Sequence, residues 1–149
     1  MKIVVTGIGI ISAIGCNKQE TLASIQAERS GVDAMQYLQS IHTHLPVGEV
    51  KMTNEALREA LNIPSHIAVG RTTLLGLAAA REALHDAALQ DVSDMAFISG
   101  TTVGGMDTTE QHWTHWLENN ALDYVHQHEA GASTETIASF IGDFSYKTT

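Results

Sequence analysis

The chain has 149 residues, 44% hydrophobic and 17% charged, a composition typical of one soluble globular domain rather than a disordered or fibrous chain. Its 17 acidic and 8 basic residues give a formal net charge of −9, so we expect it to bind neither nucleic-acid phosphates nor an anionic membrane surface. A single cysteine excludes an internal disulfide framework, and no apolar run approaches the roughly 20 residues that span a bilayer.

The first segment, residues 3–16, reads IVVTGIGIISAIGC and allows three interpretations. Ile3–Val5 is a short β-branched run that predicts a buried strand. A dinucleotide-binding loop is disfavoured, because Ser12 stands where G-x-G-x-x-G requires its third glycine and no acidic residue closes a second strand about 20 positions on. A lipoprotein signal ending at Cys16 is disfavoured, because polar and glycine residues interrupt the apolar run and Lys2 alone is a weak basic start.

Helix signals follow directly. Asn17 with Glu20 three positions later is typical of a helix start, and we expect a helix from Asn17 to near Glu28 with apolar residues at helical spacing, Leu22, Ala23 and Ile25. Ser30-Gly31 ends that pattern, and residues 32–46 show no clear period.

The next segment predicts a short edge strand and a short helix. Val47–Val50 alternates weakly between apolar and polar residues, as an edge strand does. Thr53 or Asn54 is expected to cap a helix that ends near Asn62, before Pro64.

The strongest predicted helix is Arg71–Leu89, whose apolar stripe contains Leu74, Leu77, Leu84 and Ala88. Its centre, Gly76–Ala80, consists mostly of small residues, so another backbone is expected to approach closely. Met95–Ser99 then predicts a continuous buried strand that runs into a glycine loop at Gly100–Gly105.

Two more helices complete the predicted elements. The first carries Trp113, Trp116 and Leu117. The second runs from a cap at Ser133 or Thr134 through Ile137, Phe140 and Ile141 to Gly142.

Four motif-like features occur in order within residues 6–105. They are TGIGIISAIG at Thr6–Gly15, Ser-Gly-Val at Ser30–Val32, LAAAREAL at Leu77–Leu84 and GTTVGG at Gly100–Gly105. Together they resemble the β-ketoacyl synthases, the condensing enzymes of fatty-acid and polyketide synthesis, in which a T-G-x-G-x-x-S-x-x-G segment and a G-[ST]-G-x-G-G loop flank an alanine-rich helix. Thr102 departs from that loop, since it replaces the middle glycine.

The resemblance implies an α/β chain with a thiolase-like fold. Residues 1–149 would form the amino-terminal part of a β-ketoacyl synthase domain and an incomplete portion of a layered αβαβα architecture, because such enzymes need roughly 400 residues. The family's nucleophilic cysteine lies in a T-A-C-S-S type motif, and it is expected shortly after Thr149, with the two histidines and the lysine of the site further on. We therefore expect no catalytic, cofactor-binding or metal-binding residue in this chain, no cofactor, and no activity of the fragment alone.

The family's activity implies the partners. A cysteine thiolate takes an acyl group from a thioester, and malonyl-acyl carrier protein loses carbon dioxide to give the carbanion that attacks it. Acyl carrier protein, a second subunit in a homodimer or heterodimer, and a cytoplasmic location are therefore expected. Phe144–Lys147 lacks the Gly-Pro step that often precedes the nucleophile strand, which leaves open a catalytically silent partner subunit.

Several residues have the chemistry of site residues, but their sequence context favours structural roles. Cys16 precedes a helix start, where the dipole favours a thiolate, yet a small half-buried residue is the better interpretation. Two histidine pairs, His112 with His115 and His126 with His128, lack the third ligand that a metal centre needs.

The remaining candidates lie around the predicted glycine loop. Trp113 and Trp116 are expected to be core or interface anchors rather than a ligand box. Gly104-Gly105 is expected to be a turn rather than a place where substrate meets backbone. Asp107 and Glu110 are expected at the start of a helix, where negative charge is favourable.

Overall fold

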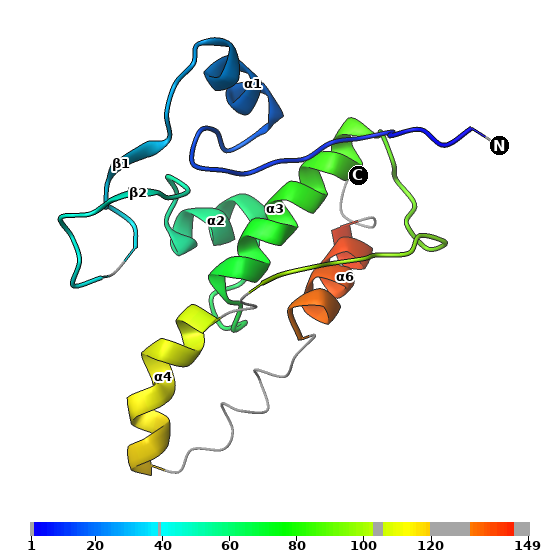
Figure 1. The fold of residues 1–149 in the computed structure, drawn as a ribbon. Helices are drawn as coiled ribbons and strands as arrows, with labels where there is room; N and C mark the ends of the chain where they lie inside the picture. The colour runs from blue at the N-terminus through cyan, green and yellow to red at the C-terminus, as the bar shows by residue number, and fades with distance from the viewer. Residues whose placement is uncertain (1, 39, 103–105, 120–131, 145–149) are drawn as a thin grey trace. The chain divides into compact units, whose positions relative to one another are not determined.

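A computed structural model describes residues 2–38, 40–102, 106–119 and 132–144 (Figure 1). The chain divides into two compact units, Met1–Pro64 with Ala78–Gln90 and Ser65–Leu77 with Asp91–Thr149. The boundary falls inside helix α3 (Arg71–Asp86), so the two halves of this helix are described with different units.

The first unit contains helix α1, Lys18–Gln26, capped by Asn17 as predicted. The Asn17 Oδ1 accepts a hydrogen bond from the Glu20 backbone N–H at 2.8 Å. The apolar residues at helical spacing do not form a buried face, because α1 buries Thr21 and Ser24 while Leu22 and Ile25 are 54% and 60% exposed. Helix α1 is therefore anchored through a polar face.

Two short strands follow α1 and pair antiparallel. Strand β1 is Val32–Ala34 and strand β2 is Pro46–Gly48, with Val32 opposite Gly48 and Ala34 opposite Pro46. Strand β2 overlaps the predicted edge strand, whereas β1 was not predicted. A three-residue strand is too short to show a period of its own, and its pairing with β2 defines it.

Helix α2, Asn54–Leu61, confirms the predicted short helix. The Thr53 Oγ1 accepts a hydrogen bond from the Ala56 N–H at 3.1 Å, which satisfies one of the unpaired donors of the first turn. Asn62 ends the helix in the left-handed conformation, with φ 56°. Leu57 and Leu61 are almost fully buried and form the apolar centre of the first unit.

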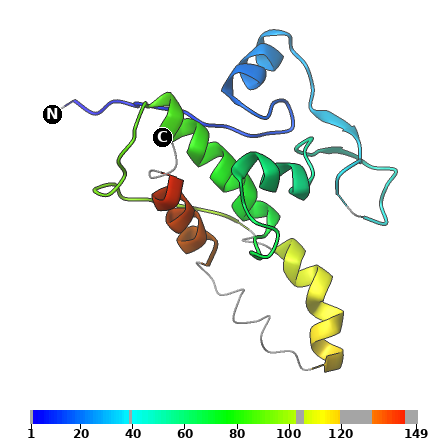
Figure 2. The same cartoon turned by 180° about the vertical axis from the view of Figure 1, so that it is seen from behind.

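The amino-terminal residues run past the carboxyl-terminal half of α3, as both cartoon views show (Figures 1 and 2). The predicted buried strand at Ile3–Val5 is wrong: the segment has no strand structure, and its three side chains are 62% to 86% exposed. A strand exists only through hydrogen bonds to a neighbouring strand. No segment among the described residues supplies one for Ile3–Val5.

The second unit contains the first half of α3, helix α4 (Met106–Asn119) and helix α6 (Ala132–Phe144). Leu74, Leu77 and Ile137 are buried. A β-carbon on Gly76 would lie 2.8 Å from the Cδ1 atom of Ile137, so a side chain of α6, rather than a backbone, approaches α3 at this glycine. Both α4 and α6 confirm predicted helices, but the predicted cap at Ser133 or Thr134 is wrong, because α6 begins at Ala132.

The second predicted buried strand, Met95–Ser99, is also wrong. This segment has no regular structure, and Met95 and Ile98 are 52% and 92% exposed. Helices with a small sheet are compatible with an α/β chain, and the layered thiolase-like architecture stays a prediction. Within the described ranges, no helix has both the length and the hydropathy of a membrane span.

Candidate functional site

The motif residues of the first unit meet where the amino-terminal segment contacts α3. We call Gly7–Cys16 and the α3 residues that it touches the glycine junction. A β-carbon on Gly7 would lie 2.7 Å from the Ala87 backbone nitrogen, and one on Gly9 would lie 2.7 Å from that of Ala83. Both distances are shorter than real β-carbon contacts, so the close approach of two backbones requires glycine at both positions.

Two carboxylates of α3 bind the backbone of this segment. The Ile8 N–H donates to Asp86 Oδ2 at 3.0 Å, and the Ile10 N–H donates to Glu82 Oε2 at 2.8 Å. The spacing of the two donors fits the spacing of the two acceptors. Amides two residues apart point to the same side of an extended segment, and side chains four residues apart lie on the same face of a helix. Glu82 also accepts the Lys18 N–H through Oε1 at 2.7 Å. One carboxylate therefore joins the amino-terminal segment, α1 and α3.

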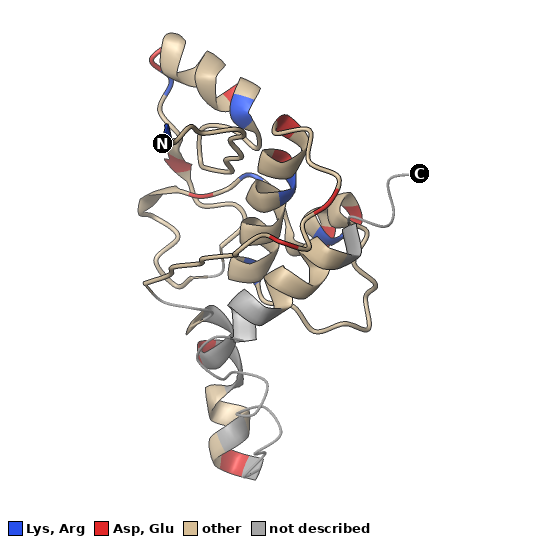
Figure 3. Cartoon of the chain, turned by 90° about the vertical axis from the view of Figure 1, so that its right-hand side faces the viewer, with Lys and Arg blue, Asp and Glu red and all other residues tan. Residues whose placement is uncertain are grey.

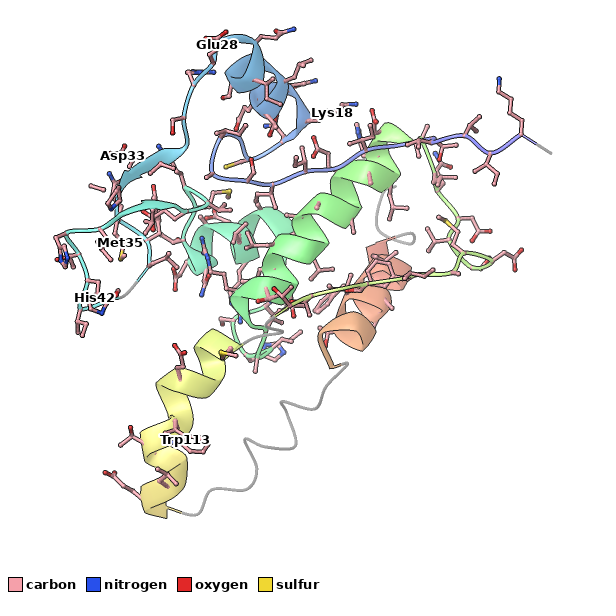
Figure 4. All side chains as sticks on the ribbon, in the orientation of Figure 1. Lys18, Glu28, Asp33, Met35, His42 and Trp113 are labelled. Carbon is pink, nitrogen blue, oxygen red and sulfur yellow. The ribbon has the colours of Figure 1, made fainter. Side chains whose placement is uncertain are left out.

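An ion pair reinforces this contact. The Lys18 Nζ donates to Asp86 Oδ1, and Figure 4 shows Lys18 at the beginning of α1. The hydrogen bond from Lys18 and the backbone hydrogen bond from Ile8 hold the pKa of Asp86 below its ordinary value. The carboxylate is thus the form that the folded chain prefers.

Ser12 closes a tight turn at the end of the segment. Its N–H donates to the Gly15 carbonyl oxygen at 2.8 Å, and its Oγ accepts from the Ile14 N–H at 3.3 Å. The Ser24 Oγ donates to the Ile14 carbonyl oxygen at 2.6 Å, which ties the turn to α1. The residue that breaks the dinucleotide motif is therefore a structural part of this turn.

The Ser-Gly-Val feature meets the same turn. A β-carbon on Gly31 would lie 2.7 Å from the carbonyl carbon and from the β-carbon of Ala13. Residues 6–15, 30–32 and 78–84, which carry three of the four features on which the resemblance rests, thus lie in the first unit.

The geometry also decides against phosphate binding at the start of α1. An anion at a helix amino terminus needs free backbone N–H groups. Here the N–H groups of Lys18, Glu20 and Cys16 donate to side-chain oxygens of Glu82, Asn17 and Glu20, respectively. Two of the three acceptors are carboxylates, which would repel a phosphate. This agrees with the sequence argument against a dinucleotide loop.

Cys16 is half-buried at this junction and is a free thiol. Burial raises its pKa, and the nearby Glu20 carboxylate raises it further. A thiol with a raised pKa is a weak nucleophile near neutral pH. The half-buried position agrees with the expected small residue before a helix, and the structural role of Cys16 stays a prediction.

Of the four histidine candidates, the structure describes the side chain of only one. His115 lies exposed on α4, whereas the His112 side chain, His126 and His128 lie outside the described residues. Among the side chains that the structure describes, no group of three or more His, Cys, Asp or Glu is placed to hold a metal ion.

Trp113 is 52% exposed on α4, so it is not a core residue, and its role as an interface anchor stays a prediction (Figure 4). The Trp116 side chain lies outside the described residues. Asp107 lies in the first turn of α4, as expected, and Glu110 lies exposed one turn later.

The predicted glycine loop is described only in part. Gly100, Thr101 and Thr102 have no regular structure and are exposed, and nothing lies within 4 Å of a β-carbon built on Gly100. Gly104 and Gly105 lie outside the described residues, so the prediction of a turn there is untested.

The sequence interpretation missed the roles of Glu82 and Asp86. Neither residue belongs to the apolar stripe of the helix, and the sequence pattern indicated no partner for either. The sequence did contain a signal for these contacts. Two acidic residues four apart lie on one face of the alanine-rich helix, where they can accept hydrogen bonds from backbone N–H groups two residues apart in the glycine segment. Each contact, however, spans more than 70 residues, and no local pattern encodes it.

Sequence comparison confirms that the chain resembles the condensing enzymes, and among them the β-ketoacyl synthases, also called 3-oxoacyl-[acyl-carrier-protein] synthases. The chain is 37% identical to 3-oxoacyl-[acyl-carrier-protein] synthase 1 of Haemophilus influenzae over 95 residues, which are 59% of this chain and 21% of that protein. It is 33% identical to 3-oxoacyl-[acyl-carrier-protein] synthase 1 of Escherichia coli K12 over 104 residues, 68% of this chain and 26% of that protein.

The aligned part is thus a fifth to a quarter of these relatives' length. No family model matches the chain, and no solved structure matches it.

Proposed function

We propose that this chain is the amino-terminal part of a β-ketoacyl-[acyl-carrier-protein] synthase that acts in fatty-acid or polyketide-type synthesis. The similarity to 3-oxoacyl-[acyl-carrier-protein] synthases carries the proposal. The glycine junction supports it, because segments that carry the resemblance, far apart in sequence, pack together there.

The proposed reaction is a decarboxylative Claisen condensation. A cysteine thiolate attacks the carbonyl carbon of an acyl thioester and expels the carrier's thiolate, which leaves an acyl-cysteine. A malonyl thioester on acyl carrier protein then loses carbon dioxide, and the electron pair of the broken bond forms an enolate that attacks the acyl-cysteine. The cysteine leaves as a thiolate, and hydrogen-bond donors stabilise the oxyanions.

The proposal assigns this cysteine, the two histidines and the lysine to sequence beyond Thr149. Residues 1–149 then contribute the scaffold rather than the reacting groups. The half-buried position of Cys16 and its raised pKa support this division, because such a thiol is poorly suited to attack a thioester.

The proposed partners are acyl carrier protein and a second synthase subunit, in the cytoplasm. A basic patch would favour docking of an acidic carrier protein. Figure 3 shows the described Lys and Arg residues spread over several helices and loops. The carrier-binding surface is therefore assigned to the longer protein as a whole.

A catalytically silent partner subunit is the second candidate. It is favoured by the absence of the Gly-Pro step in Phe144–Lys147. Such a subunit would keep the scaffold and the pairing surface but carry glutamine or another non-nucleophile in place of the cysteine.

The test compares the 149-residue chain with the product of the gene extended to the length of the relatives. Each protein is incubated with an acyl-[acyl-carrier-protein] thioester, and intact mass reports acyl transfer. We expect an acyl adduct on the long protein, lost when its motif cysteine is replaced, and none on the 149-residue chain.

Two outcomes discriminate the alternatives. An acyl adduct on the 149-residue chain that disappears in Cys16→Ser contradicts the assignment of the nucleophile. A long protein with no cysteine at the motif and no adduct favours the silent partner.

A further inference from the structure

Glu49 is a buried carboxylate that neither the sequence interpretation nor the proposed reaction uses. It follows strand β2 directly and is 6% exposed. Its Oε1 accepts the Gln36 N–H at 2.5 Å, and its Oε2 accepts the N–H groups of Tyr37 and Leu38, each at 2.9 Å. Three successive amides therefore converge on one carboxylate.

Three consecutive N–H groups that point to one anion form a nest, a concave site for carboxylates or phosphates. We call Gln36, Tyr37 and Leu38 the amide nest. Hydrogen bonds to an ionised acceptor are roughly twice as strong as neutral ones, and the burial of Glu49 keeps water from competing. The nest is therefore an anion site whose occupant belongs to the same chain.

The strand register shows that hairpin geometry alone does not bring these groups together. Ala34 pairs with Pro46 at the loop end of the sheet, and Val32 pairs with Gly48 at the opposite end. Glu49 therefore lies beyond the end that is remote from the loop. The chain after β1 must fold back along the sheet to reach this carboxylate, so the carboxylate itself holds the folded-back segment.

The segment beyond the nest presents exposed side chains. Leu38 is 46% and Ile41 is 90% exposed, and Figure 4 shows His42 on this loop. Exposed apolar side chains contribute to recognition at lower entropic cost when their backbone is fixed. The carboxylate in the nest thus determines whether this surface is presented in one conformation.

We propose that the amide nest is a general carboxylate-binding site that this chain fills with its own Glu49, which acts as a latch on residues 36–38. A small external carboxylate then binds the nest when the latch is removed. The ligand class is an anion with two acceptor oxygens, such as formate or acetate.

The experiment is chemical rescue of Glu49→Ala in the 149-residue chain, followed by amide hydrogen exchange. We expect the amides of residues 36–38 to exchange about tenfold faster or more in this variant, as the loss of one charge-assisted hydrogen bond per amide requires, while amides of α2 keep their protection. Sodium formate should restore the protection with a saturable concentration dependence. Neutral formamide and sodium chloride at equal ionic strength should not.

The control variant is Glu59→Ala, which removes an exposed carboxylate from α2 in the same unit and should leave the nest amides unchanged. Unchanged exchange of residues 36–38 in Glu49→Ala overturns the proposal, as does rescue by formamide or chloride equal to that by formate.

If Glu49→Ala does not fold, Glu49→Asp and Glu49→Gln decide. Glu49→Asp, which keeps a carboxylate on a shorter side chain, should keep part of the exchange protection of residues 36–38. Glu49→Gln, which replaces the carboxylate by an amide, should lose this protection. Equal protection in the two variants overturns the proposal.

Discussion

Gly9 and Ala83 lie so close that a β-carbon on Gly9 would come within 2.7 Å of the Ala83 backbone nitrogen. The contact joins an extended segment to a helix that begins more than 60 residues later. It explains the glycine by packing rather than by turn formation or ligand binding. The alanines of the LAAAREAL feature then form the surface that the glycines require.

Gly9→Ala should therefore destabilise the first unit. Because the methyl group must displace backbone on α3, we expect a loss of about 1–3 kcal/mol in the free energy of unfolding, as for an overpacked core. The matched control is Gly48→Ala, whose β-carbon would make an ordinary 3.5 Å contact with Ala13 Cβ in the same unit. Urea denaturation measures both, and equal midpoints would contradict the packing argument.

Glu82→Gln should also destabilise this unit, through hydrogen bonding rather than packing. The carboxylate accepts two backbone N–H groups with different oxygens, and an amide replaces one acceptor by a donor. We expect a loss of about 1.5–3 kcal/mol, the range for hydrogen bonds to a charged group.

The control for this variant is Glu59→Gln, which neutralises an exposed glutamate in α2. Its urea midpoint should match that of the parent chain. If the two glutamine variants unfold alike, the junction carboxylate has no special role.

Asp86 should make the stability of the first unit depend on pH in the acid range. Its pKa is lowered in the folded chain from the ordinary value of 3.8, first by the hydrogen bond from Lys18 and then by that from Ile8. Ionisation therefore favours folding. This contribution is complete above the unfolded pKa of about 4 and is lost as the pH falls through the lower folded pKa.

Asp86→Asn should accordingly be less stable than the parent chain at pH 7 and approach it at the lowest pH at which both chains still fold. Urea midpoints from pH 7 downward measure this difference, with Asp94→Asn as a control for removal of an exposed aspartate. A difference between Asp86→Asn and the parent that does not shrink on acidification would contradict the assignment.

Cys16 should react slowly with iodoacetamide at neutral pH. Burial raises its pKa, and Glu20 adds to the effect, so little thiolate is present. The pH midpoint of the alkylation rate should therefore lie higher in the folded chain than in the same chain in concentrated urea. Glu20→Gln should shift the folded midpoint down only in part, because burial is the larger cause. Identical profiles in the folded and unfolded chain would show that the thiol is freely accessible.

Local signals predicted the helices well. Asn17 and Thr53 cap α1 and α2 with their side-chain oxygens, as their residue types indicate. The two predicted buried strands, Ile3–Val5 and Met95–Ser99, are absent, because a β-branched or apolar run indicates a strand preference but does not supply a pairing partner. The pairing of β1 with β2 is likewise fixed by non-local contacts, and β1 could not be found from residues 32–46 alone.

The candidate site was predictable only in its glycines and alanines. The sequence pattern indicated a close backbone approach to the helix, and Gly7 and Gly9 make that approach to its second half. The carboxylates that bind the approaching backbone, Glu82 and Asp86, depend on a register between distant segments. The contacts of Glu49 could not be predicted for the same reason. Its partners lie on a segment that folds back along the sheet, and no periodic pattern in the sequence indicates this fold-back.

The contact between Ile8 and Asp86 has a consequence during protein synthesis. The two residues are 78 positions apart, so at roughly 5–20 residues per second a ribosome needs about 4–16 s to add the helix residue after the glycine segment. For that interval the apolar start of the chain has no α3 to contact. A nascent chain halted before Asp86 would lack this contact, and docking of the segment on α3 would be complete only when translation has passed the end of the helix.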